Sequence, residues 1–244
     1  MASNPVPPHH PAMTDLATRI AALDWPRIAA ELDARGSATT GQLLSQQECT
    51  ALAALYTQPA AFRSRIVMAR HGFGSGEYQY FAAPLPAPVA TLRHALYAQL
   101  APIANAWAVR LGTPPYPVAH QDFLATCHAA GQTRPTPLLL KYVVGDYNCL
   151  HQDRYGDLAF PLQAAFLLSD PAQDFTGGAF VLVEQRPRMQ SRPEVVPLRQ
   201  GEAVIFATNH RPVAGTRGTY RVALRHGVSR LLSGERQTLG VIFH

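Results

Sequence analysis

The part of the chain from residue 137 onward alternates short apolar runs with turn residues. Glycine and proline clusters separate the runs at a spacing of about ten residues, which is typical of antiparallel strands in a sandwich or barrel. The runs cover residues 138–144, 161–169, 178–185, 202–208, 220–228 and 236–243. This pattern predicts a double-stranded β-helix, or jelly roll, over residues 137–244.

Residues 15–136 have a different pattern, because their apolar residues recur mostly at helical spacing. Ser45 and Glu48 form a capping-box pattern, which predicts the start of a helix. The longest predicted helix covers residues 87–112 and is interrupted or bent at Pro102. We therefore expect an α+β fold in which an N-terminal helical layer packs on the jelly-roll core.

The length of 244 residues, 47% of them hydrophobic, is enough for one sizeable core. We expect a disordered lead over residues 1–14, followed by a single domain over residues 15–244. No apolar run reaches the roughly 18 residues of a transmembrane helix. A reduced, cytoplasmic protein is predicted by the absence of a secretory signal pattern and of CxxC spacing among Cys49, Cys127 and Cys149.

The sequence His-Gln-Asp occurs twice, at residues 120–122 and 151–153. The first copy begins a segment with helical spacing. On a helix, residues two apart point in different directions, so His120 and Asp122 cannot easily share a metal ion. We expect the first copy to be a surface histidine and aspartate near the start of a helix.

The second copy follows a predicted strand. In extended backbone, residues two apart lie on the same face, so His151 and Asp153 can point together into the mouth of a barrel. Two histidines and one carboxylate form a facial triad that binds Fe(II) and leaves open positions. The His-x-Asp pair alone is a weak signal, because a polar loop gives the same pattern.

A third ligand must come from a distant strand, and His210 and His226 are the candidates. His226 ends a predicted strand, and the next strand carries Arg236 and Thr238 on one face. A guanidinium can bind a carboxylate through two parallel hydrogen bonds, and a hydroxyl can add a third. We favour His226, because glycine and proline predict a loop after His210.

At these residues the chain resembles the Fe(II)/2-oxoglutarate-dependent oxygenases, in particular their prolyl-4-hydroxylase-like branch. That family's pattern contains Tyr, a Gly turn, His-x-Asp, Phe-x-Gly-Gly, His, Gly, Arg and Ser or Thr. The matching positions are Tyr142, Gly145, His151, Asp153, 175–178, His226, Gly234, Arg236 and Thr238. The whole chain also resembles a bacterial group of such oxygenases labelled as acting on damaged DNA.

The resemblance implies that His151, Asp153 and His226 bind Fe(II) and that Arg236 binds the far carboxylate of 2-oxoglutarate. It implies helper roles for Tyr142, Thr238, Tyr147 and Asn148, and it allows ascorbate as a reductant. The expected activity is hydroxylation, with O2 as oxidant and succinate and CO2 as co-products. Asp153 supports this outcome, since halogenating relatives have a small residue at that position. The expected substrate is a small molecule or a peptide side chain.

Two alternatives stay open at this stage. Oxidative dealkylation of a damaged nucleic-acid base needs a basic groove and aromatic residues that stack a flipped base. The net charge of +5 supports an anionic partner only weakly, and the arginines of residues 184–193 fit a solvated loop as well as a contact. A cupin-like metal-binding protein without turnover is the other alternative, although it would not need Arg236. The glycine-rich residues 71–81 fit either a lid or a hairpin.

Overall fold

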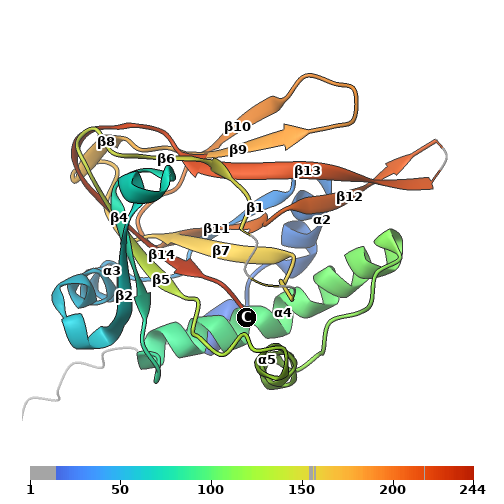
Figure 1. The fold of residues 1–244 in the computed structure, drawn as a ribbon, viewed down its shortest axis with the longest axis horizontal. Helices are drawn as coiled ribbons and strands as arrows, with labels where there is room; N and C mark the ends of the chain where they lie inside the picture. Colours follow the sequence, from blue (N-terminus) through green and yellow to red (C-terminus); the bar gives the residue numbers. More distant parts are fainter. Residues whose placement is uncertain (1–14, 154–155, 157, 217) are drawn as a thin grey trace, which may run out of the picture.

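The computed structural model describes residues 15–153, 156, 158–216 and 218–244, so the predicted lead over residues 1–14 lies outside the described residues. Two antiparallel sheets form the centre of the molecule, and helices cover one of them (Figure 1). This arrangement confirms the predicted α+β class with a double-stranded β-helix core.

The larger sheet contains most of the buried apolar strands. Its order is β1-β11-β7-β14-β5-β4-β2, and β8 pairs with β14. Strand β7 lies inside the sheet, between β11 and β14, and is buried along almost its whole length. The bounds are β1 Ser37–Gln42, β2 Phe62–Val67, β4 Glu77–Phe81, β5 Leu138–Val143, β7 Leu162–Leu167, β8 Phe175–Gly177, β11 Glu202–Ala207 and β14 Leu231–Val241.

The smaller sheet faces the larger one and has the order β10-β9-β13-β6-β3, with β12 paired to β13. Strands β9 and β10 form one hairpin of this sheet, and strands β12 and β13 form another (Figure 1). The bounds are β3 Gly74–Ser75, β6 Tyr147–His151, β9 Phe180–Gln185, β10 Arg192–Val196, β12 His210–Gly215 and β13 Gly218–Val228.

The helices are α1 Leu16–Ala21, α2 Trp25–Arg35, α3 Gln46–Ala54, α4 Ala87–Leu111 and α5 His120–Ala129, with short 3₁₀ turns η1 Leu55–Thr57, η2 Pro59–Ala61 and η3 Met68–His71. The capping box is present: Ser45 and Glu48 each accept a hydrogen bond from the other's backbone N–H. Helix α4 contains Pro102 yet is continuous, because buried side chains on both sides of the proline hold it against the sheet.

Helix α4 runs across the larger sheet on the side away from the smaller sheet (Figure 1). Leu92, Leu96 and Leu100 of α4 are fully buried in one core with Phe166 of β7 and Ile205 of β11. The sheet therefore has apolar side chains on both faces. One face packs on the helical layer, and the other faces the smaller sheet.

The N-terminal part is not purely helical. Residues 15–136 also supply strands β1, β2, β3 and β4, which extend both sheets at their edges. The glycine-rich residues 71–81 connect β3 of the smaller sheet to β4 of the larger one, so they link the two sheets. Because N-terminal strands complete both sheets, we keep the proposal of one domain over residues 15–244.

Helices long and apolar enough to cross a membrane are absent from the described residues.

Candidate active site

Two histidines face each other across neighbouring strands of the smaller sheet. His151 ends β6, and β13 pairs with β6 in a register that puts His226 opposite it. Their ring centroids are 4.2 Å apart. Gly227 permits this close pairing, since a Cβ there would lie 2.7 Å from the carbonyl oxygen of Asn148. Strand register thus joins two imidazoles that are distant in the sequence.

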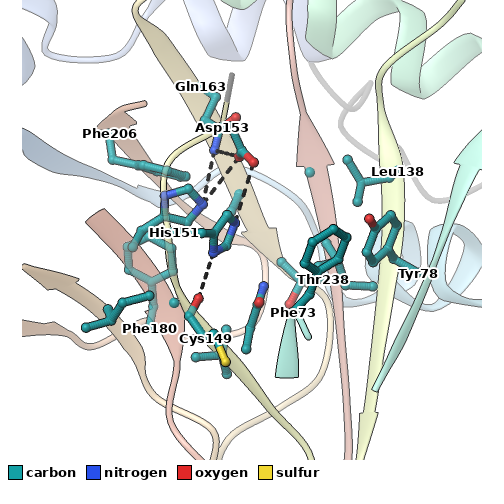
Figure 2. A pocket seen from close by; sticks show the side chains of 18 of the residues that line it. Phe73, Tyr78, Leu138, Cys149, His151, Asp153, Gln163, Phe180, Phe206 and Thr238 are labelled. Atoms are coloured by element: carbon teal, nitrogen blue, oxygen red, sulfur yellow. Dashed lines mark hydrogen bonds and ion pairs between the residues drawn. The ribbon is translucent and has the colours of Figure 1, made fainter. Parts of the chain in front are cut away.

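Asp153 lies beside His151 (Figure 2) and contacts both imidazoles. Its Oδ1 is 3.5 Å from Nε2 of His151, and its Oδ2 is 3.3 Å from Nε2 of His226. The candidate ligand atoms of the three residues all lie within 4.8 Å of one another. In the described part of the chain, this is the one group of histidine, cysteine and acidic side chains that could hold a metal ion.

Burial and charge set the protonation of this group. Burial raises the pKa of Asp153, but hydrogen bonds with His151 and His226 outweigh it and hold that pKa well below its usual range. Burial lowers the pKa of His226. Burial also opposes the charged form of His151, but the Asp153 carboxylate outweighs it and raises the pKa of His151. A metal ion would therefore find a ready carboxylate and a neutral imidazole, and would compete with a proton at His151.

Outer hydrogen bonds orient the three side chains. Nδ1 of His151 donates to the carbonyl oxygen of Cys149 at 2.7 Å, which leaves Nε2 directed at Asp153. Nε2 of Gln163 donates to Oδ2 of Asp153 at 2.6 Å. Contacts of this kind fix the tautomer and ring orientation of histidines at metal sites. Three electron-rich ligand atoms that converge in this way fit a divalent cation.

A buried guanidinium lies in the same cavity. Arg236 is 3% exposed, and its Nη1 donates to Oγ1 of Thr238 at 2.7 Å. Its Nε is buried without a hydrogen-bond partner among the described residues. Tyr142 lies opposite Arg236 on β5, and burial raises the pKa of its hydroxyl to about 12. A buried cation without a carboxylate is costly, so this end of the cavity suits an anionic group.

The cavity that contains both groups has a volume of about 360 Å³. Asp153, His151, His226 and Arg236 supply its charged or readily charged side chains among the described lining residues. The rest of the wall is apolar or carries neutral polar groups. The charged side chains of the cavity are therefore confined to two places, the group of three candidate ligands and Arg236.

An oxygenase family described as catalysing oxidative methylation of damaged DNA matches residues 76–244. The chain belongs to this family. Two uncharacterised proteins, one from each of two strains of Mycobacterium tuberculosis, are 52% identical to the oxygenase over 165 residues. The match covers 67% of this chain and 71% of each relative.

Solved structures with the same fold include a Pseudomonas putida prolyl-4-hydroxylase, with a TM-score of 0.56, 18% identity, and coverage of 90% of this chain and 98% of that one. A Trichoplax adhaerens prolyl hydroxylase, in complex with a hypoxia inducible factor peptide fragment, has a TM-score of 0.57, 12% identity and coverage of 93% and 91%. A Burkholderia pseudomallei oxidoreductase of the 2OG-Fe(II) oxygenase family has a TM-score of 0.53, 14% identity and coverage of 89% of both chains.

The solved structures establish the fold, and the family match establishes an oxygenase. The family match confirms the assignment as an enzyme, and the shared fold agrees with the predicted 2-oxoglutarate/Fe(II) oxygenase. The alternative of a metal-binding protein without turnover is therefore rejected.

The oxygenase brings most of the predicted site residues together. Tyr147 is the exception: it is 42% exposed and is not among the described residues that line the cavity. The predicted residues that line the cavity are His151, Asp153, His226, Arg236, Thr238, Tyr142 and Asn148.

The first His-Gln-Asp copy opens helix α5, as predicted, and takes no part in the group of three. The predicted surface position of His120 is wrong, because only 6% of this residue is exposed. Its Nε2 donates to the carbonyl oxygen of Phe243 at 2.7 Å, and its Nδ1 is 2.8 Å from Nδ1 of His94. The packing of α5 on the residues after β14 decides this burial, and local spacing cannot reveal it.

His210 also lies outside the group of three, but the reason given for discounting it is wrong. The residues after it form strand β12 rather than a loop. Pro212 is compatible with this strand because, among the described strands, β12 pairs with β13 alone, so a missing N–H on its other edge breaks no ladder bond.

Sequence reasoning missed several residues of the site. Phe206 packs its ring 4.6 Å from that of His226 and restricts the imidazole. Gln163 bonds to Asp153, and Phe73 lines the cavity while 48% exposed. Gln163 did leave a signal, since it is the one polar residue in the apolar strand β7. Phe206 and Phe73 left none, because their role depends on which strands pack together.

Proposed function

We propose that the oxygenase binds Fe(II) through His151, Asp153 and His226, and binds 2-oxoglutarate through Arg236 and Thr238. The observation that carries the proposal is the buried guanidinium. It has no carboxylate partner among the described residues and lines the same cavity as the three converging ligands. A metal site and a guanidinium in one cavity suit a co-substrate that offers one carboxylate to Arg236 and a keto acid to the metal.

Fe(II) with 2-oxoglutarate supplies the activation of O2, with succinate and CO2 as co-products. The protein residues bind, orient and exclude water. Arg236 neutralises the distal carboxylate, and Tyr142 and Asn148 are the polar neighbours that assist it. Phe180 and Phe206 keep the inner wall apolar beside His226. Ascorbate as a reductant and a cytoplasmic location belong to the same proposal, and free cysteines support the location.

The outcome that we propose is hydroxylation of an uncharged group on a small molecule or a protein side chain. Asp153 supplies the carboxylate ligand that this outcome needs. After the metal and co-substrate sites are assigned, the described wall has no charged side chain left to neutralise a charged reacting group. Burying an unpaired charge would cost too much, so a neutral substrate moiety is favoured.

A second candidate is oxidative dealkylation of a damaged nucleic-acid base. The description of the family names damaged DNA. The structure adds an exposed aromatic pair, His71 and Phe73, with ring centroids 5.3 Å apart and an interplanar angle of 23°. Phe73 reaches the cavity, so a flipped base could stack on it. This observation supplies the stacking surface that the sequence did not reveal.

Iron content and turnover of alanine variants test the metal assignment. We expect His151→Ala and His226→Ala to retain no Fe(II) after anaerobic loading and desalting, and to release no succinate from 2-oxoglutarate. His210→Ala and His120→Ala are the matched controls and should retain about one iron per chain, the stoichiometry of one facial triad. Normal iron content in His226→Ala, with loss in His210→Ala, would show that the wrong histidine was chosen.

A further inference from the structure

Gln163 lies at the metal centre although it belongs to an otherwise apolar strand. It is 5% exposed on β7 and sits opposite Phe206 of β11. A buried amide in such a strand is costly unless it forms hydrogen bonds. We therefore expect the Gln163 amide to form a hydrogen bond with a residue that lines the cavity.

That partner is the carboxylate of Asp153. Nε2 of Gln163 donates to Oδ2 of Asp153 at 2.6 Å and lies 3.4 Å from Nε2 of His226 (Figure 2). The donor must be the amide nitrogen, since an ionised carboxylate only accepts. Oε1 of Gln163 is buried without a hydrogen-bond partner among the described residues. Among the described residues, the polar contacts of the Gln163 amide are thus confined to the candidate metal ligands Asp153 and His226.

We infer that Gln163 is a positioning residue that makes Asp153 present a single oxygen to the metal. The inference rests on the proposed function. A facial triad must leave three positions for the co-substrate and O2, and a carboxylate bound through both oxygens would occupy one of them. A hydrogen bond to Oδ2 makes that oxygen the poorer ligand. Gln163 thereby sets both the affinity for the metal and its coordination number.

Replacement of Gln163 by methionine tests the inference, because methionine has a similar length and lacks the N–H donor. Metal-free protein is titrated anaerobically with Co(II), and its visible absorption spectrum is recorded. We expect the Kd for Co(II) to rise about 10- to 100-fold, the usual effect of losing an outer hydrogen bond to a metal ligand. The spectrum should also change, because the second carboxylate oxygen becomes free to bind.

Gln237→Met is the matched control. Gln237 lies on β14, and its amide donates to Glu235 rather than to a cavity residue. We expect its Co(II) affinity and spectrum to match those of the wild type. Gln163→Leu is measured in parallel, and the thermal midpoint of each metal-free variant establishes that it is folded.

Wild-type affinity and spectrum in a folded Gln163→Met or Gln163→Leu protein would overturn the inference while leaving the proposed function in place. Failure of the wild-type protein itself to bind Co(II) would instead overturn the proposed metal site, and the inference with it.

Discussion

At the scale of single residues, the candidate active site contains two buried charged groups whose charges are compensated in different ways. Asp153 is held between two imidazoles and the Gln163 amide, so its charge is compensated within the protein. Arg236 has only a neutral hydroxyl, that of Thr238, as a hydrogen-bond partner among the described residues. The contrast supports the proposal that the carboxylate belongs to a metal site and that the guanidinium binds an anionic group of the co-substrate.

Replacing Arg236 tests this distinction. Arg236→Ala should weaken 2-oxoglutarate binding by about 2–5 kcal/mol, or roughly 30- to 4,000-fold, because the distal carboxylate loses a charge-assisted pair. Arg236→Lys should rescue little, since it lacks the planar fork. Calorimetric titration of the metal-loaded protein measures the Kd, and iron content should stay at the wild-type level. An unchanged 2-oxoglutarate Kd in Arg236→Ala would remove the main support for the proposed function.

At the scale of elements, the register between β6 and β13 decides which side chains meet. A shift of one residue would turn His226 away from His151, and Gly227 lets the two strands approach closely enough for the pairing. Helix α5 stabilises another part of the fold. His120 of α5 donates a hydrogen bond to the carbonyl oxygen of Phe243 and so holds the residues that follow β14.

His120→Ala should therefore reduce stability without loss of iron. At pH 8 we expect a loss of about 2–4 kcal/mol, from the cavity and from the unpaired carbonyl of Phe243. Burial lowers the pKa of His120 from its ordinary value of 6.5 to about 3. Between these values the unfolded chain binds a proton that the folded protein does not, so the wild type loses stability as pH falls below about 6.5.

The variant lacks this titration. The difference in unfolding free energy between wild type and His120→Ala should thus shrink by about 1.4 kcal/mol per pH unit below pH 6. Urea denaturation at pH 8 and pH 5, with iron content measured at both, tests it. A difference that is independent of pH would show that His120 is not held neutral in the folded protein.

At the scale of the whole molecule, two sheets enclose the cavity, and the chain carries a modest net charge of +5. Two of the three arginines of residues 184–193 are less available than the sequence suggests. Arg186 and Arg192 lie 2.7 Å and 3.6 Å from Glu184. Arg221 and Arg225 are exposed along β13, and neither has an acidic partner among the described residues. Any contact with an anionic polymer is therefore better supplied by β13 than by the β9–β10 loop.

We expect weak, non-specific binding to duplex DNA, with a Kd of about 1–100 μM at physiological salt. Replacing both Arg221 and Arg225 by alanine should reduce the slope of log K against log salt by at most about 2, since each contact releases about one counterion. Replacing Arg186 and Arg192 should reduce it less, because Glu184 already pairs with them. Fluorescence anisotropy at several salt concentrations measures the slopes.

The same samples test the second candidate function. If the enzyme hydroxylates a small molecule or a protein side chain, as proposed, methylated single-stranded DNA should yield no formaldehyde above background. Robust formaldehyde release that is lost in His151→Ala would make base dealkylation the activity of this enzyme. Succinate release from amino-acid, peptide and methylated-nucleotide pools would then rank the substrate classes.

Features of this protein that depend on local spacing were predictable from the order of its residues. Alternation and turn residues predicted the jelly-roll strands, and residues two apart on extended backbone placed His151 with Asp153, and Arg236 with Thr238. Tertiary structure decided whatever depends on pairing between distant segments. It buried His120, made a strand of residues 210–215, extended both sheets with N-terminal strands, and brought Gln163 to Asp153. The physical reason is that periodicity records which face of an element is buried, whereas strand order and register determine what that face meets.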